Sequence, residues 1–290
     1  MSDFVIFTDS SADLSGEMVS QLDVQVLPLS FILEEHAYFN YPDNRDMDPH
    51  LFYDRLRRGG MATTNAVNVA QYTEALEPFL QAGQDILILA FSSGLSTTYH
   101  SSLIAVEELS AKYPGRKLYA VDTLCASLGQ GLLVWYAARE RERGHSIDEV
   151  RDWVEEHKLN ICHQFTVDDL HFLKRGGRIS GATAVVGSML HIKPVLHVDN
   201  EGRLVSTGKA RGRHASLKAL VDRMEQTAID SGSLTVFVSH GDCLGDAQAV
   251  ADMVKRRFGV HEIYINHVGP VIGAHSGPGT LALFYMGTER

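Results

Sequence analysis

A segment rich in hydroxyl side chains follows Asp85–Phe91, the most apolar strand-like stretch of the chain. A strand that runs into such a turn and then into a helix is the setting of a serine nucleophile in the Gly-x-Ser-x-Gly motif. Here Gly94 and Ser96 fit the motif, but Thr98 stands where its last glycine belongs, and a Cβ there would crowd the sharp turn. Neighbouring hydroxyls and the N–H groups of a helix N-terminus favour an anion. We therefore predict a carboxylate or phosphate site that includes Ser93, Gly94 and Ser96.

Two further segments carry side chains that can contact an anion. Thr63 and Thr64 supply hydroxyls in residues 61–68, which the sequence predicts to be a polar turn before a helix. His275 lies within residues 269–280, which are too rich in Gly and Pro to predict core secondary structure. A histidine held on a tight loop can donate a hydrogen bond to an anion or act as a base.

The same side chains allow a second, enzymatic interpretation. A serine hydrolase would use Ser96 as the nucleophile, His275 as the base and Asp122 to orient the imidazole. The chain order serine, aspartate, histidine is that of the α/β-hydrolases. Because the second glycine of the elbow is absent, anion binding is the first interpretation and hydrolysis is the alternative.

Charge is distributed unevenly along the 290 residues, whose formal net charge is −10. Residues 171–215 carry eight Lys and Arg against two acidic residues. Arg175 and Arg178 flank a glycine pair in this segment, which predicts a flexible basic loop that approaches an anion or an acidic partner. The acidic remainder argues against general nucleic-acid binding, which requires a basic surface.

Composition and cysteine usage indicate the compartment. Hydrophobic residues make up 44% and charged residues 21% of the chain, which is typical of a soluble globular protein and excludes a disordered one. Cys125, Cys162 and Cys243 are isolated, so we expect no disulfide framework and a reducing, cytoplasmic environment. We also expect neither a signal peptide at Met1–Phe4 nor a membrane span, since no apolar run reaches about 18 residues.

Metal and cofactor binding are not indicated by the spacing of ligand residues. His261, Glu262 and His267 do not fit the H-E-x-x-H pattern, and the histidines are dispersed. The glycine-rich segment 176–181 is neither a dinucleotide-binding fingerprint nor a P-loop. We therefore expect no metal and no cofactor, and we do not expect the chain alone to be a kinase.

The elements that position these residues predict a two-domain α/β protein. Strands and helices alternate up to about residue 159, which predicts a parallel, Rossmann-like sheet over residues 1–159. The main strands expected there are Phe4–Thr8, Val24–Leu33, Asp85–Phe91 and Lys117–Asp122, with a long loop over residues 34–50. The run Asp199–Gly202 between two apolar stretches predicts an antiparallel hairpin. Residues 160–290 therefore predict an α+β domain with a largely antiparallel sheet.

Six segments, in this order and along nearly the whole chain, resemble motifs of the DegV family. They are Thr8–Leu14 (like T-D-S-S-A-D-L), Thr63–Val67 (like T-S-Q-P-S), Ser92–Tyr99 (like S-S-G-L-S-G-T-Y), Val121–Ser127 (like a V-D-S strand end), Leu173–Ser180 (like L-x-R-G-G-R-x-S) and His275–Thr280 (like H-x-G-P-G-T). The second segment lacks the glutamine and proline of the family, and Thr97 replaces a glycine in the third. One such motif would be weak evidence, whereas six in register are specific.

The resemblance implies a protein that holds one long-chain fatty acid, such as palmitate, in a buried tunnel between its two domains. It places the carboxylate on Thr63 and Ser96, with His275 as the third contact. The neighbouring ligand-binding residues that we expect are Thr64, Ser93 and Gly94.

Some members of the family are the fatty-acid-binding subunit of a bacterial fatty acid kinase, in which a separate ATP-binding subunit converts the bound acid to an acyl phosphate. The resemblance therefore implies a non-catalytic carrier with a kinase subunit as its expected partner. Arg175, Arg178 and Arg211 are the residues that would dock this partner or steady the phosphate.

Overall fold

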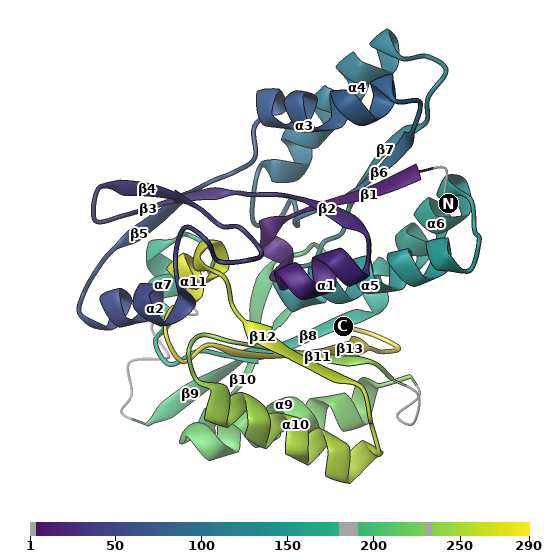
Figure 1. Cartoon of the computed structure of the whole chain (residues 1–290). Coiled ribbons are helices and arrows are strands. Elements are labelled where there is room, and N and C mark those ends of the chain that lie inside the picture. Colours follow the sequence, from purple (N-terminus) through teal and green to yellow (C-terminus); the bar gives the residue numbers. More distant parts are fainter. Residues whose placement is uncertain (1–3, 180–190, 230–233) are drawn as a thin grey trace.

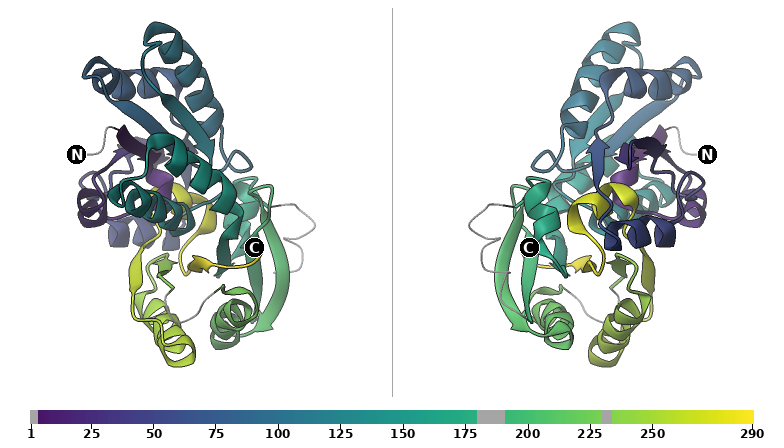
Figure 2. Two further views of the ribbon diagram at one scale, coloured as in Figure 1. Left: turned by 90° about the vertical axis from the view of Figure 1, so that its right-hand side faces the viewer. Right: turned by 90° about the vertical axis from the view of Figure 1, so that its left-hand side faces the viewer.

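The computed structural model describes residues 4–179, 191–229 and 234–290 and shows a two-domain α/β fold, as predicted. In both side views of Figure 2 an N-terminal lobe (purple and blue) stands above a C-terminal lobe (green). Three sheets carry the described part of the fold, and the two larger ones lie in different lobes.

The N-terminal sheet is parallel throughout, which confirms the prediction from alternating strands and helices. In spatial order its strands are β2 (Val24–Leu27), β1 (Phe4–Asp9), β6 (Asp85–Ala90) and β7 (Leu118–Asp122). Alternate residues of β1 enter different buried clusters, Phe4 and Ile6 on one face and Val5 and Phe7 on the other. Because both faces are buried, helices must cover both sides of this sheet.

Four helices provide that cover (Figure 1). One face packs against α3 (Val69–Gln81) and α4 (Thr98–Lys112), and the other against α5 (Leu128–Glu142) and α6 (Ile147–His157). Asn68 begins α3 with a capping box, in which its side chain accepts from the N–H of Gln71 at 2.9 Å. This cap holds the chain just before α3, where the two candidate threonines lie. The remaining short elements of this lobe are 3₁₀-helix η1 (Ser10–Ala12), α1 (Gly16–Gln21), α2 (Pro49–Arg57) and 3₁₀-helix η2 (Lys158–Asn160).

Two strands of a small antiparallel sheet, β4 (His36–Phe39) and β5 (Ala62–Asn65), stand where the sequence predicted a long loop and a polar turn. In spatial order this sheet comprises β4, β3 (Ser30–Leu33) and β5. Pro28 cannot donate to a sheet ladder, so the single strand expected over Val24–Leu33 is two strands in different sheets. Glu34 and Glu35 both have positive φ, as a two-residue hairpin turn of type I′ requires. Neither is the Gly or Asn from which such a turn is normally predicted.

The C-terminal sheet is antiparallel except for one pair of strands. In spatial order it comprises β10 (Leu204–Arg211), β9 (Ile192–Val198), β8 (Ile161–Thr166), β13 (Leu281–Met286), β11 (Val236–His240) and β12 (Ile263–His267). The pair β9–β10 is the predicted hairpin, and β11–β12 is the parallel pair. Strand β13 is not among the predicted elements; it is apolar throughout and lies between β8 and β11.

The two lobes share one buried core around α5. The outer face of the C-terminal sheet is covered by α9 (Arg213–Thr227) and α10 (Leu244–Phe258), whereas α5 lies against its inner face. Leu132 of α5 belongs to the same cluster as Ile6 of β1 and Phe284 of β13. The division at residue 159 stays a prediction, because the core around α5 is continuous across both lobes.

Residues 269–280 contain a helix, so the prediction of an irregular loop there is wrong. Helix α11 (Pro270–Ser276) begins with a proline at a position where no backbone N–H is needed, and it ends before Gly277, whose φ is +80°. It packs beside α7 (Leu170–Arg175) and α2, between the two lobes (Figure 1). Within the described residues no helix combines the length and the apolar character needed to cross a lipid bilayer.

Candidate functional site

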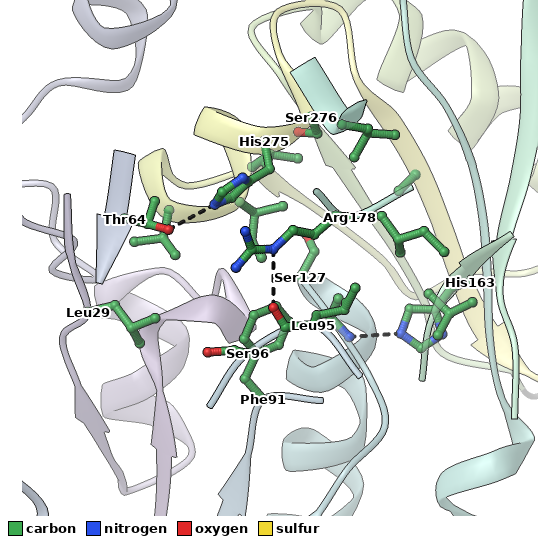
Figure 3. Close-up of a pocket in the computed structure, with 18 of the residues that line it drawn as sticks. Leu29, Thr64, Phe91, Leu95, Ser96, Ser127, His163, Arg178, His275 and Ser276 are labelled. Atoms are coloured by element: carbon green, nitrogen blue, oxygen red, sulfur yellow. Dashed lines mark hydrogen bonds between the residues drawn. The ribbon is translucent and has the colours of Figure 1, made fainter. Parts of the chain in front are cut away.

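A cavity of about 430 Å³ lies where the carboxyl end of the N-terminal sheet meets the inner face of the C-terminal sheet. Pockets for small molecules are typically about 300–1,000 Å³. The apolar part of its wall comes from both lobes and consists of Leu29, Ala66, Phe91, Leu95, Ala126, Phe165, Leu173, Val198, Leu204, Val268, Val271, Ile272, Ala282 and Phe284. Side chains from four segments gather on one side of the cavity: Thr64, Ser96, Arg178 and His275 (Figure 3). We call these four residues the polar end of the cavity.

The structure turns Thr64, and not Thr63, toward the cavity. Neighbouring side chains of a strand point to opposite faces, so Thr63 lies opposite the exposed Ile32 whereas Thr64 lies opposite the buried Phe31. The Oγ1 of Thr64 is hydrogen-bonded to Nε2 of His275 at 2.8 Å. The place expected for Thr63 in the wall is therefore taken by Thr64.

His275 occupies the last turn of α11, with its ring packed against the chain at Gly176. A Cβ added to Gly176 would lie 2.2 Å from Nδ1 of His275, so this close approach requires glycine. Burial, together with the smaller effect of the positive charges of Arg178 and Arg175, lowers the pKa of His275 to about 4. The imidazole is therefore neutral at pH 7, as a hydrogen-bonding group in a partly buried binding site should be.

The pKa of His275 makes stability depend on pH. In the unfolded chain the ring takes up a proton near pH 6.5, whereas in the folded protein it does so only near pH 4. The free energy of unfolding of the lipid-free protein should therefore fall as pH falls from about 6.5 to 4, and the contribution of His275 should be on the order of 2 kcal/mol. Urea unfolding at pH 7 and at pH 4 should show a smaller loss for H275Q than for the wild type. Equal losses in both proteins would contradict this role of the ring.

Arg178 lies in the wall of the cavity, although the sequence suggested a residue that faces a partner. Its Nε donates to the carbonyl oxygen of Leu95 at 3.2 Å, and Nη1 donates to the carbonyl oxygen of Gly176. Burial lowers the pKa of Arg178, but a guanidinium remains charged at any physiological pH. Arg178 therefore brings a fixed positive charge to the polar end of the cavity, and its role toward a partner or a phosphate stays a prediction.

The other two arginines expected to contact a partner or a phosphate lie outside the cavity. Arg175 is exposed, and its guanidinium lies 4.9 Å from the centre of the Phe172 ring. Arg211 is the exposed last residue of β10, and about 23 Å of strand separates it from Leu204 in the cavity wall. The structure thus separates Arg178, at the cavity, from two arginines that face solvent.

The hydroxyl-rich loop before α4 contributes Ser93 and Ser96 to the cavity wall. The Oγ of Ser96 accepts from the N–H of Thr98 at 3.2 Å and lies 3.0 Å from the hydroxyl of Thr98. Gly94 is exposed instead, and a Cβ there would lie 2.7 Å from the carbonyl oxygen of Glu201. Gly94 therefore lets the β9–β10 hairpin pack against this loop. It is not among the residues that line the cavity, so its contact with a ligand stays a prediction.

The geometry does not assemble the hydrolase triad considered from the sequence. An oxygen of the Asp122 carboxylate accepts from the N–H groups of Ser93 and Leu124, both at 3.1 Å. The Nε2 of His275 is occupied by Thr64. Among the hydrogen bonds of the described residues, none joins Ser96, His275 and Asp122 to one another.

A second set of polar residues in the cavity wall was missed from the sequence. His163 is buried, with Nε2 accepting from the N–H of Ala126 at 3.2 Å and Nδ1 donating to the carbonyl oxygen of Ile161 at 2.9 Å. Burial holds its pKa well below the usual range, so it is a neutral structural ring. Ser127 also lines the cavity and donates at 2.6 Å to Asp13, whose pKa burial raises to about 7. Asp13 belongs to the first motif of the chain, but only the fold brings it to Ser127.

One protein family matches nearly the whole chain. The model of the DegV family, described as an uncharacterised protein family, matches residues 3–288. A DegV domain-containing protein of Clostridium perfringens is 48% identical over 290 residues, which are 100% of this chain and 99% of that protein.

Solved structures agree with this assignment. A DegV family protein from Thermus thermophilus, described by its fatty acid binding, is 30% identical with a TM-score of 0.86 and covers 98% of this chain and 99% of its own. A DegV lipid-binding protein from Thermotoga maritima is 27% identical with a TM-score of 0.88 over 100% of both chains. The whole described chain, from the parallel sheet to the last strand of the C-terminal sheet, belongs to the DegV family.

Proposed function

We propose that this protein binds one long-chain fatty acid in the cavity between its lobes, with the carboxylate at the polar end. The observation that carries the proposal is an apolar cavity with Thr64, Ser96, Arg178 and His275 gathered on one side. The DegV proteins of Thermus thermophilus and Thermotoga maritima, which bind a fatty acid and a lipid respectively, support the class of ligand.

Electrostatics favours an anionic head group over a neutral one. Arg178 is the one Lys, Arg, Asp or Glu among the described residues that line the cavity. A charged donor and a carboxylate form a stronger hydrogen bond than two neutral groups do, all the more in a partly desolvated site. The hydroxyls of Thr64 and Ser96 can donate to the remaining lone pairs of the carboxylate.

The acyl chain supplies most of the binding free energy. Burying about fourteen methylenes of a sixteen-carbon acid contributes about 11 kcal/mol before the cost of association is subtracted. This gross value exceeds what one charge-assisted hydrogen bond contributes, about 1.5–3 kcal/mol. The apolar wall therefore retains the ligand, and the polar end orients it.

Extraction of the purified protein with organic solvent, followed by mass spectrometry, tests the proposal. We expect a fatty acid at a stoichiometry close to one per chain, and the spectrum will give its length. Absence of lipid, together with no uptake of added palmitate or oleate, would refute the proposal and leave only the fold.

Neighbouring threonines of β5 offer a matched pair of variants for the head site. Thr64→Ala removes a hydroxyl that faces the cavity and should weaken binding about fivefold, the effect of one neutral hydrogen bond. Thr63→Ala removes the adjacent hydroxyl, which is exposed, and should leave the Kd unchanged. Calorimetric titration of the delipidated variants with palmitate measures both. An effect of Thr63→Ala equal to that of Thr64→Ala would refute the placement of the head group.

We further propose that the protein is a cytoplasmic carrier that presents its acid to a separate ATP-dependent kinase subunit. Arg175 and Arg211 of the basic segment are both exposed, and their charges support docking of an acidic partner. With ATP and the kinase subunit of a bacterial fatty acid kinase, acyl phosphate should form only when both proteins are present. Acyl phosphate formed by this chain and ATP alone would contradict the carrier role.

A further inference from the structure

Three potential metal ligands from distant parts of the sequence meet outside the lipid cavity. They are His50 in the first turn of α2, Asp242 just after β11, and His267 at the end of β12. A ligand atom from each lies within 4.8 Å of those from the other two. The sequence indicated no metal site, because these residues have none of the short spacings of known metal motifs.

The parallel pair β11–β12 explains why Asp242 and His267 are neighbours. His240 lies directly opposite His267 in this pair, so the chain after β11 leaves the sheet beside the end of β12. Carboxyl ends of adjacent parallel strands are a recurrent place for ligands. Helix α2 adds His50, whose Nδ1 lies 2.5 Å from a carboxylate oxygen of Asp242.

An unused nitrogen in this cluster points to a missing ligand. Nε2 of His267 is buried and has no hydrogen-bond partner. Leaving a buried polar atom unpaired costs about 1–3 kcal/mol, so a native structure normally provides a partner. The neighbouring ring of His240 is already committed, because its Nδ1 accepts from the N–H of Cys243 at 3.3 Å.

We propose that His50, Asp242 and His267 bind a divalent transition-metal ion, with zinc as the best match. Two imidazoles and one carboxylate, with the fourth position left to water, are a common ligand set for zinc. Metal–ligand bonds of about 2.0–2.2 Å require ligand atoms about 3.4 Å apart, so the ligand atoms of His50 and Asp242, now 2.5 Å apart, must separate to admit the ion. The His50 side chain is 68% exposed and can make that movement, while Asp242, at 15%, is held in place.

Arg57 orients the carboxylate from the side away from His50. Its guanidinium pairs with the second oxygen of Asp242 and donates at 3.0 Å to the carbonyl oxygen of the same residue. A carboxylate that binds a metal is usually hydrogen-bonded by an outer-shell group, which is the role of Arg57 here. The positive charge of Arg57 also lowers the affinity of the site, which suits an exchangeable ion better than a permanently buried one.

The ion would join the N-terminal lobe to the wall of the lipid cavity. His267 is followed by Val268, which lines the cavity and whose carbonyl oxygen accepts from the hydroxyl of Tyr53 in α2 at 2.7 Å. A metal between α2 and β12 would strengthen this same connection. The metal site does not depend on the proposed fatty acid, and its test needs no lipid.

Titration of the tag-free protein with Co²⁺, and displacement by Zn²⁺, tests the site directly. We expect one Co²⁺ per chain with the visible absorption of a four-coordinate nitrogen and oxygen site, abolished by one equivalent of Zn²⁺.

H267A and D242N should weaken binding at least about tenfold, and Asn tolerates the positive φ at position 242. H50A, at an exposed position, keeps the test valid if the other two variants fold poorly. H261A, which changes an exposed histidine outside the cluster, should bind as the wild type does. Absence of Co²⁺ binding, or binding that survives in both H50A and H267A, would overturn the proposal.

Discussion

Replacing Arg178 by alanine should raise the Kd for a long-chain fatty acid about 10- to 100-fold. Arg178 brings the fixed positive charge among the described residues of the cavity wall, and a hydrogen bond to a charged group contributes about 1.5–3 kcal/mol. The loss should appear with palmitate but not with a neutral analogue such as the corresponding alcohol, because only the carboxylate pairs with the guanidinium. Calorimetric titration of delipidated protein with both ligands measures the difference.

The neighbouring Arg175 provides the matched control. It has the same side chain and lies on the same basic segment, but it is exposed and stacks on Phe172 outside the cavity. R175A should therefore bind palmitate as the wild type does, and R178K should recover part of the affinity because it restores the charge without the guanidinium fork. If R178A also bound palmitate normally, Arg178 would have no part in holding the carboxylate and would be left with the docking role suggested by the sequence.

Local patterns predicted those parts of the fold that are regular over short distances. The apolar runs of β1 and β6 and the turn residues of the β9–β10 hairpin each contain their own signal. Strands β4 and β5 of the small sheet have no such signal, because each has only four residues and is largely exposed, and the tight turn before β4 uses Glu34 and Glu35. Strand β13 could not be placed because its position between β8 and β11 depends on pairing with residues about 45 and 120 positions away along the chain.

The sequence motif predicts Thr63 at the carboxylate, whereas Thr64 faces the cavity. The helix cap that follows these residues could have revealed the correct alignment with the family motif. The last serine of the T-S-Q-P-S motif is a residue type that begins helices, and the observed N-cap of α3 is Asn68, which belongs to the same class. Aligning that serine with Asn68, and not with Val67, makes Thr64 the first threonine of the motif. The cap therefore contained the correct register, whereas the threonine pair by itself did not.

The position of Arg178 could not be predicted, because it depends on contacts between three distant segments. The loop after α7 lies against the last turn of α11, where Gly176 meets His275, and against the loop before α4, where Arg178 donates to Leu95. The charge pattern alone predicted a basic segment that faces a partner or a ligand, without separating its arginines. The fold divides this segment into Arg178 at the cavity and Arg175 in solvent, so one cluster of arginines serves two environments.

The close contact between Gly176 and His275 makes Gly176→Ala a disruptive substitution at the polar end of the cavity. The backbone of Gly176 is right-handed, with φ −71°, so alanine is compatible with it, and the whole effect comes from a methyl group 2.2 Å from Nδ1 of His275. The ring must move, which breaks its hydrogen bond with Thr64 and displaces it from the polar end of the cavity. Overpacking of this kind costs about 1–3 kcal/mol. We expect G176A to lower the melting temperature by several degrees and to weaken palmitate binding at least about tenfold.

Two further variants separate the steric cause from a general effect of removing a glycine. A Cβ at Gly208 in β10 would meet no atom within 4 Å, and G208A should leave both melting temperature and Kd unchanged. In a protein that already carries H275A the methyl group has no ring to displace, so adding G176A should cost much less stability than it does in the wild type. Thermal unfolding of the four proteins of this cycle gives the coupling between positions 176 and 275. If G176A lowered the stability equally with and without the imidazole, the close contact with His275 would not hold the ring at the polar end. The head site would then rest on Thr64, Ser96 and Arg178 alone.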